Sequence, residues 1–110
     1  MNRTIFITGA TGNIGGKIVI RILKDDLSAR LILLIRGQNE ADIWNRLSTN
    51  LRILEPNFNL ERYRGNIEII GGDITEEHLG LSDSIRKELT GKITHIIHSA
   101  AATRFTLPLL

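Results

Sequence analysis

Three glycines spaced three residues apart near the amino terminus form the first pattern in this sequence that predicts chemistry. Gly9, Gly12 and Gly15 follow the apolar run 5–7 and precede a stretch with helical periodicity. A strand, a glycine-rich turn and a helix can bind a pyrophosphate, because absent side chains let the anion reach the free N–H groups at the helix start. The spacing Thr-Gly-x-x-Gly-x-x-Gly from Thr8 therefore predicts a dinucleotide site. A tight turn without a ligand is the less favoured alternative.

The turn as a whole is expected to contact the cofactor. Its predicted binding residues are Thr8, Gly9, Thr11, Gly12, Asn13, Ile14 and Gly15.

Arg36 ends the second apolar run, where many NAD-binding proteins carry an acidic residue that binds the adenosine ribose hydroxyls. A guanidinium suits a 2′-phosphate instead, through a charge-assisted and bidentate contact. Arg46, one turn into the next predicted helix, either faces the same phosphate or lies on a solvated helix face. Arg36 and Arg46 therefore predict NADP(H) over NAD(H), the alternative for Arg36 being a solvated strand-end arginine.

Two further strand ends carry residues suited to the remainder of the cofactor. Asp73 follows a strand and a glycine pair, so its carboxylate can accept from the adenine amino group while Ile74 covers the ring. The alternative is that Asp73 caps the turn behind it, and both roles are compatible. After the fourth strand, Ser99, Ala100 and Ala101 offer backbone near the expected nicotinamide half, although small residues also suit helix–strand packing.

The sequence offers a cofactor site without a catalytic site. Tyr63 is followed four residues later by Ile67 rather than lysine, so it does not begin a Tyr-x-x-x-Lys proton relay, and no nucleophile–base pair is visible. His95 and His98 are three apart on one strand and face opposite sides, so the histidines form no metal set. We therefore predict no catalytic and no metal-binding residues.

Alternating strands and helices must position these residues. Strands are expected at 3–7, 31–35, 67–70 and 94–98. Helices are expected at 13–24, between an Asn39 cap and a stop at Pro56, and behind a Ser82 cap. This βαβαβαβ order predicts an α/β, Rossmann-type parallel sheet of order 3-2-1-4 with helices on both faces. The strand ends that carry the motifs then converge on one crevice.

Helical spacing and polarity also predict which side chains lie inside. Ile14, Ile18 and Ile22 recur every four residues, with Val19 and Leu23 beside them, and this face of the first helix is expected to face the core. Ile85 and Leu89 are expected to do so from the third helix. Residues 57–66 are expected to form a polar surface excursion with a short helix around 60–63.

The composition bounds the remaining function classes. The chain has 110 residues, 42% of them hydrophobic, with no cysteine and a net charge of +2 from scattered basic residues. A single domain fits this length, and the charge gives no reason to expect nucleic acid as a partner. No apolar run approaches the roughly 18 residues of a membrane helix, and no secretory signal is apparent. We expect a cytoplasmic protein.

The sequence resembles the reductase family of thioester reductase domains, carboxylic acid reductase terminal domains and fatty acyl-CoA reductases. The resemblance covers nearly the whole chain and rests on segments 8–15, 34–37, 46–47, 72–75, 79–82, 98–101 and 104–105. The pair Gly-Asp-Ile and Leu-Gly-Leu-Ser, at 72–74 and 79–82, is the most distinctive. The resemblance implies NADPH-dependent reduction of a carrier- or CoA-linked acyl thioester to an aldehyde or alcohol, and supports Arg36 and Arg46 as a 2′-phosphate pair.

The family's catalytic serine or threonine, tyrosine and lysine follow the fourth strand, and this sequence stops before them. Residues 1–110 are therefore expected to be the amino-terminal portion of the dinucleotide-binding domain, inactive alone, with an unpaired strand-four edge that favours self-association. Asn13 stands where the family often has an aromatic residue. Two alternatives stay open: a non-enzymatic NmrA-like NADP(H)-binding module, and the start of a sugar-nucleotide epimerase or dehydratase.

Overall fold

The computed structural model describes residues 3–37, 39–73 and 75–99. Along the chain its elements are β1 (Thr4–Thr8), α1 (Asn13–Asp25), β2 (Arg30–Ile35), α2 (Glu40–Leu54), the 3₁₀ helix η1 (Leu60–Asn66), β3 (Ile67–Gly71), the short η2 (Glu77–Gly80), α3 (Asp83–Lys92) and β4 (His95–His98). The strands pair in parallel in the order β3-β2-β1-β4. The predicted Rossmann-type order is confirmed.

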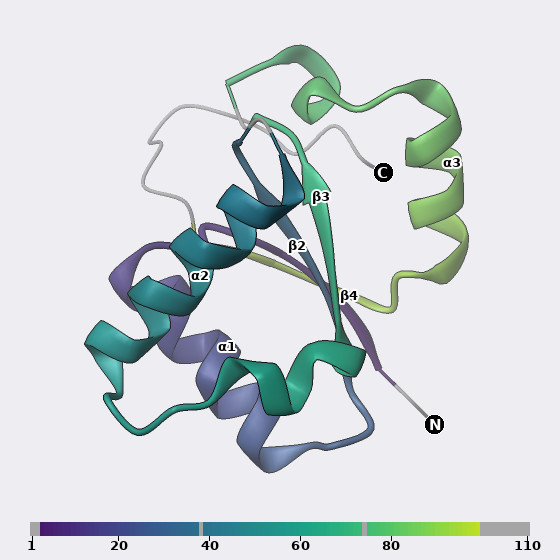
Figure 1. The fold of residues 1–110 in the computed structure, drawn as a ribbon. Coiled ribbons are helices and arrows are strands. Elements are labelled where there is room, and N and C mark those ends of the chain that lie inside the picture. The colour runs from purple at the N-terminus through teal and green to yellow at the C-terminus, as the bar shows by residue number, and fades with distance from the viewer. Residues whose placement is uncertain (1–2, 38, 74, 100–110) are drawn as a thin grey trace.

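Helices cover both faces of the sheet, α1 and α2 on one and α3 on the other (Figure 1). Successive side chains of each buried strand alternate between two cores, as the pleat requires. From β1, Ile5 and Ile7 join the core beneath α1 and α2, whereas Phe6 joins the core beneath α3. The continuously apolar runs therefore reflect strands buried on both sides.

The two predicted helix caps are present. Asn39 accepts the backbone N–H of Asp42 through its side chain at 2.9 Å, and Ser82 accepts that of Ile85 at 3.2 Å. Each cap satisfies an N–H group that has no partner inside its helix. α2 and α3 therefore start where the sequence predicts.

The face of α1 that packs inward agrees with the predicted one at Val19 and Leu23 but not at Ile14. Ile14 is 70% exposed, while Val19, Leu23 and the glycine pair at 15–16 are buried. A Cβ on Gly16 would lie 2.5 Å from Leu54 Cδ1 on α2, so the two helices approach closely at this glycine. Ile14 therefore contributes to the surface and not to the core.

The expected surface excursion at 57–66 is largely interior. Phe58, Leu60 and Tyr63 are buried, and the rings of Phe58 and Tyr63 stack with centroids 5.4 Å apart. These side chains belong to the core beneath α1 and α2. The polar residues between them made the segment look solvated.

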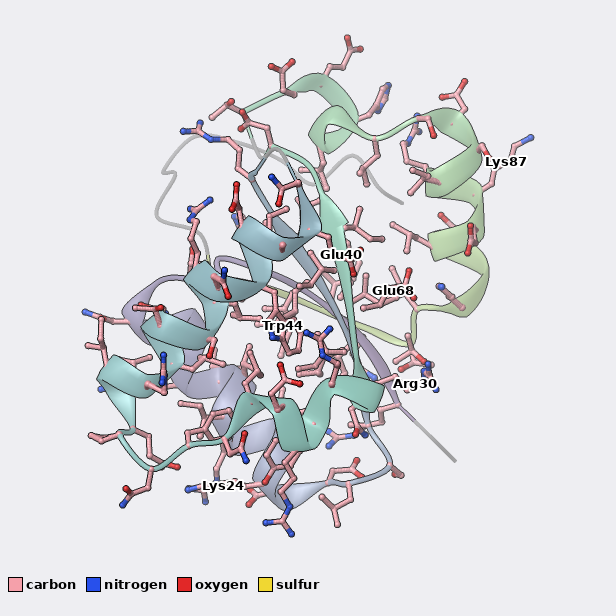
Figure 2. All side chains as sticks on the ribbon, in the orientation of Figure 1. Lys24, Arg30, Glu40, Trp44, Glu68 and Lys87 are labelled. Atoms are coloured by element: carbon pink, nitrogen blue, oxygen red, sulfur yellow. The ribbon has the colours of Figure 1, made fainter. Side chains whose placement is uncertain are left out.

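Trp44 ties α2 to η1 (Figure 2). Its Nε1 donates to Glu61 Oε1 at 2.9 Å, and the Arg64 guanidinium lies over the indole, 4.1 Å from its centroid. Arg64 also donates to the Glu61 carboxylate, and these two hydrogen bonds, that of Arg64 first, hold the pKa of Glu61 below its ordinary value of 4.5. The three side chains fix the segment before β3.

On the other face, Leu89 is buried as predicted, but Ile85 is 38% exposed. Leu79 and Leu81, which precede α3, occupy the same core as Leu89. This core is therefore completed by the segment before α3 and not by Ile85. Across the described ranges, no helix is long and apolar enough to cross a membrane.

Candidate functional site

A cavity of about 710 Å³ lies where the carboxyl ends of the four strands meet. Residues expected from the sequence that line it are Gly9, Thr11, Gly12, Asn13, Ile14, Arg36, Arg46, Asp73 and Ser99. Strand order brings them together, since they come from four separate βα junctions. This matches the crevice at the topological switch point of a doubly wound sheet.

Two expected residues do not line the cavity. Thr8 is fully buried in β1, and Gly15 is buried beneath the turn. Ile74, Ala100 and Ala101 lie outside the residues that the structure describes.

Leu34, Gly72 and Thr75 line the cavity but were not predicted. Thr75 had a sequence signal, because a threonine two residues after an aspartate commonly closes a small hydrogen-bonded turn. Leu34 and Gly72 had none, since they reach the cavity only through the pairing of β2 with β3.

The three motif glycines have three different structural roles. Gly9 adopts φ 80°, a left-handed conformation that favours glycine. A Cβ on Gly15 would lie 1.9 Å from the Gly9 carbonyl oxygen, so Gly15 is required for helix and turn to touch. A Cβ on Gly12 would meet only that oxygen, at 3.4 Å, and would otherwise point into open space. Only Gly12 is therefore dispensable for the fold itself.

The start of α1 presents unused hydrogen-bond donors to the cavity. The first intrahelical bond joins the Gly16 N–H to the Gly12 carbonyl at 2.8 Å, so the N–H groups of residues 13–15 have no acceptor within the helix. No acidic residue lies in this first turn, and the Gly12 cap has no side chain. Asn50 of α2 donates to the Gly12 carbonyl at 3.5 Å and braces the turn. A helix terminus of this kind attracts an anion.

Two arginine side chains lie beside the carboxyl end of β2, Arg36 from the strand end and Arg46 from α2. Arg46 Nη1 donates to the Arg36 carbonyl oxygen at 2.5 Å, which fixes both the strand end and the direction of the Arg46 side chain. A Cβ on Gly37 would lie 2.4 Å from Ile43, so glycine lets α2 begin close above this strand end. The Arg36 side chain itself is 77% exposed, with Nη1 3.6 Å from Asp73 Oδ2.

Asp73 does cap the turn that follows β3, as the alternative expectation held. Its Oδ1 accepts the Thr75 N–H at 2.9 Å and the Thr75 hydroxyl at 2.6 Å. These bonds, the hydroxyl first, together with nearby Arg36, hold the pKa of the Asp73 carboxyl below its ordinary value of 3.8. Asp73 is therefore ionised at neutral pH, with Oδ2 directed toward Arg36.

The segment behind Asp73 has an uncommon backbone. His78, Leu79 and Gly80 have φ of 54°, 61° and 71°, three consecutive residues in the left-handed region. Leu79 is buried and its carbonyl accepts the Asp73 N–H at 2.9 Å. Burial of Leu79 offsets the conformational cost, and the turn holds the Asp73 backbone in place.

At the end of β4, Ser99 joins the cavity wall to β1. Its N–H and its hydroxyl both donate to the Thr8 carbonyl, at 3.2 Å and 2.9 Å. The Thr8 hydroxyl is hydrogen-bonded to His98 Nδ1. Thr8 thus stabilises the site from below, which explains why it is buried.

This sheet order, its glycine turn and the open helix start define a dinucleotide-binding domain of the Rossmann type. Residues 7–110 match the NAD-binding family model described as "male sterility protein", and the chain belongs to that family. It is accordingly a domain that binds a nicotinamide dinucleotide.

The relatives that the chain matches include several reductases. It is 29% identical over 106 residues to the L-2-aminoadipate reductase large subunit of Penicillium chrysogenum, covering 96% of this chain and 7% of that protein. It is 30% identical over 112 residues to a carboxylic acid reductase of Mycobacterium tuberculosis, covering 96% and 10%. The chain therefore spans a small part of these relatives.

Among solved structures, the chain is similar to the terminal R domain from the myxalamid PKS-NRPS biosynthetic pathway. The TM-score is 0.82 at 33% identity, over 94% of this chain and 26% of that one. The family assignment favours the reductase resemblance over the NmrA-like and epimerase alternatives.

Proposed function

We propose that residues 1–110 are the NADP(H)-binding, amino-terminal portion of an oxidoreductase that reduces carrier- or CoA-linked acyl thioesters to aldehydes or alcohols. The reductases among its relatives support the reaction class. The observation that carries the cofactor choice is the pair Arg36 and Arg46 beside the cavity, at a strand end where NAD-binding proteins commonly have an acidic residue. Two guanidinium cations suit a phosphate better than neutral ribose hydroxyls.

Each part of the cavity is assigned one part of the cofactor. We propose that the pyrophosphate lies on the N–H groups of Asn13, Ile14 and Gly15, with Gly12 and Thr11 beside it. Gly9 and Thr8 shape the turn. Arg36 and Arg46 would hold the 2′-phosphate, Asp73 and Ile74 the adenine, and Ser99, Ala100 and Ala101 the nicotinamide half.

When bound, the cofactor would supply the hydride for this reduction, which with one proton converts a thioester into an aldehyde and a free thiol; a second hydride and proton would give the alcohol. The contribution of the present residues is to bind and orient the dinucleotide. The Gly12 carbonyl is braced by Asn50 and the Arg36 carbonyl by Arg46, so the two phosphate-binding places are positioned before any ligand arrives. Preorganisation of this kind lowers the ordering cost of binding.

The cofactor choice predicts a specific loss of affinity. Arg36→Ala is expected to weaken NADPH binding by about ten- to a hundredfold, the worth of a charge-assisted hydrogen bond, and not to weaken NADH binding. Calorimetric titration of both nucleotides measures the effect. Arg52→Ala, an exposed α2 arginine outside the cavity, is the matched control and should change neither affinity. Equal affinity of the unmodified chain for NADPH and NADH would contradict the proposal.

The chain's own surface suggests a further partner, a second copy of itself. Within the described residues β4 pairs with β1 alone, and an unpaired strand edge favours pairing with another chain. Sedimentation of residues 1–110 is expected to show mass that rises with concentration. A single monomeric species across the range would refute it.

The cytoplasmic location remains a prediction, which cell fractionation tests.

A further inference from the structure

We propose that the 2′-phosphate draws Arg36 away from Asp73 and so frees Asp73 to bind the adenine amino group. The two ends of the adenosine moiety would then bind cooperatively, and recognition of the base would depend on the phosphate. This inference rests on the proposed NADP(H) site and adds a coupling between two of its residues.

Asp73 is the fixed member of the pair. Both Thr75 donors are used on Oδ1, and the Asp73 backbone N–H is held by the carbonyl of buried Leu79. The Asp73 side chain is only 23% exposed. Its Oδ2 is therefore the oxygen still able to take a new donor, and it is the one that faces Arg36.

Arg36 is the movable member. Its side chain is 77% exposed, and the 3.6 Å separation from Asp73 exceeds the roughly 2.7–2.9 Å of a charge-assisted hydrogen bond. Its backbone is fixed by Arg46, so the guanidinium can turn while the strand end stays in place. A weak, exposed ion pair is readily exchanged for a phosphate, which carries more charge and accepts a bidentate contact.

The exchange changes the acceptor strength of Asp73. While the Arg36 cation is beside Oδ2, it offsets the negative charge that would attract an amino N–H. Once Arg36 has moved to a phosphate, Oδ2 regains that charge and the space beside it. With a nucleotide that lacks the 2′-phosphate, Arg36 stays beside Asp73. The hydrogen bond from the adenine amino group to Oδ2 is then weaker.

Four nucleotides form a cycle that measures this coupling directly. NADPH and NADH are compared with their hypoxanthine analogues, in which a carbonyl replaces the adenine amino group, by calorimetric titration of residues 1–110 at one salt concentration. The loss of affinity on replacing the amino group is expected to be about threefold larger in the NADPH pair than in the NADH pair. A factor of this size corresponds to the contribution of one exposed ion pair. In Arg36→Ala the two costs should become equal.

Variants of Thr75 provide a second test of the inference. Thr75→Val removes the hydroxyl that holds Asp73 and should reduce the preference for adenine over hypoxanthine in both pairs, whereas Thr75→Ser should retain it. Equal costs in the two pairs of the unmodified chain, or analogues that bind as tightly as the adenine forms, overturn the inference while leaving the NADP(H) site intact. Failure to bind NADPH more tightly than NADH overturns the proposed cofactor instead.

Discussion

Alanine at position 15 is expected to prevent the amino-terminal βα unit from packing. The added Cβ would lie 1.9 Å from the Gly9 carbonyl oxygen, 2.6 Å from the Gly9 carbonyl carbon and 2.6 Å from Ser99 Oγ. Two of these atoms are backbone atoms that cannot rotate away. α1 would have to lift off the turn and lose its close contact with α2 through Gly16.

Overpacking of this severity is expected to cost about 3 kcal/mol or more of unfolding free energy. For a domain of this size, that loss lowers Tm by more than about 10 °C. Thermal unfolding followed by circular dichroism measures it. Gly91→Ala is the matched control, since Gly91 also lies in a helix, has nothing within 4 Å of its added Cβ, and should tolerate alanine or gain slightly. A Gly15→Ala variant as stable as the control would show that the turn and helix can separate without cost.

Alanine at position 12 is expected to leave the fold intact and remove nucleotide binding. Gly12 has φ −89° and ψ 173°, which alanine adopts freely, and its Cβ would meet a single atom at 3.4 Å. That methyl group would stand over the open N–H groups of α1, where a pyrophosphate must reach the backbone. NADPH affinity is expected to fall by about ten- to a hundredfold, with Tm within a few degrees of the unmodified chain.

The two readouts separate binding from folding. Gly65→Ala serves as the control, because Gly65 lies in η1, outside the cavity, and has nothing within 4 Å of its added Cβ. It should retain both Tm and NADPH affinity. Undiminished NADPH binding by a folded Gly12→Ala variant would place the pyrophosphate elsewhere. Two glycines of one motif thus have separable effects on stability and on binding, since Gly15 faces protein and Gly12 faces the ligand.

Local sequence determined the architecture of this protein. The continuous apolar run at 31–35 is typical of a strand buried on both faces, and the capping side chains of Asn39 and Ser82 act within their own segments. Once strands and helices alternate, short right-handed connections leave few sheet orders. The same reasoning brought Arg36 and Asp73 to one edge of the sheet, because parallel strands share their carboxyl ends.

Contacts between distant segments decided the rest. Periodicity within α1 did not show that Ile14 is exposed, because it carries no information on close contacts with another helix, such as that of Gly16 with Leu54. Residues 57–66 read as solvated because Glu61 and Arg64 are charged, yet both side chains contact Trp44, which lies 17 and 20 residues earlier in the chain.

The glycine turn also has features that the local sequence determined and features that only the tertiary structure determined. Its sequence alone predicted an anion site, because three glycines before a helix have a direct physical meaning. Only the folded chain determined which glycine faces the ligand, which one packs against the turn, and that the Asp73 oxygen facing the site is already paired with Arg36. Those outcomes depend on how β1, β3 and α1 pack against one another, and local propensity carries no information about that packing.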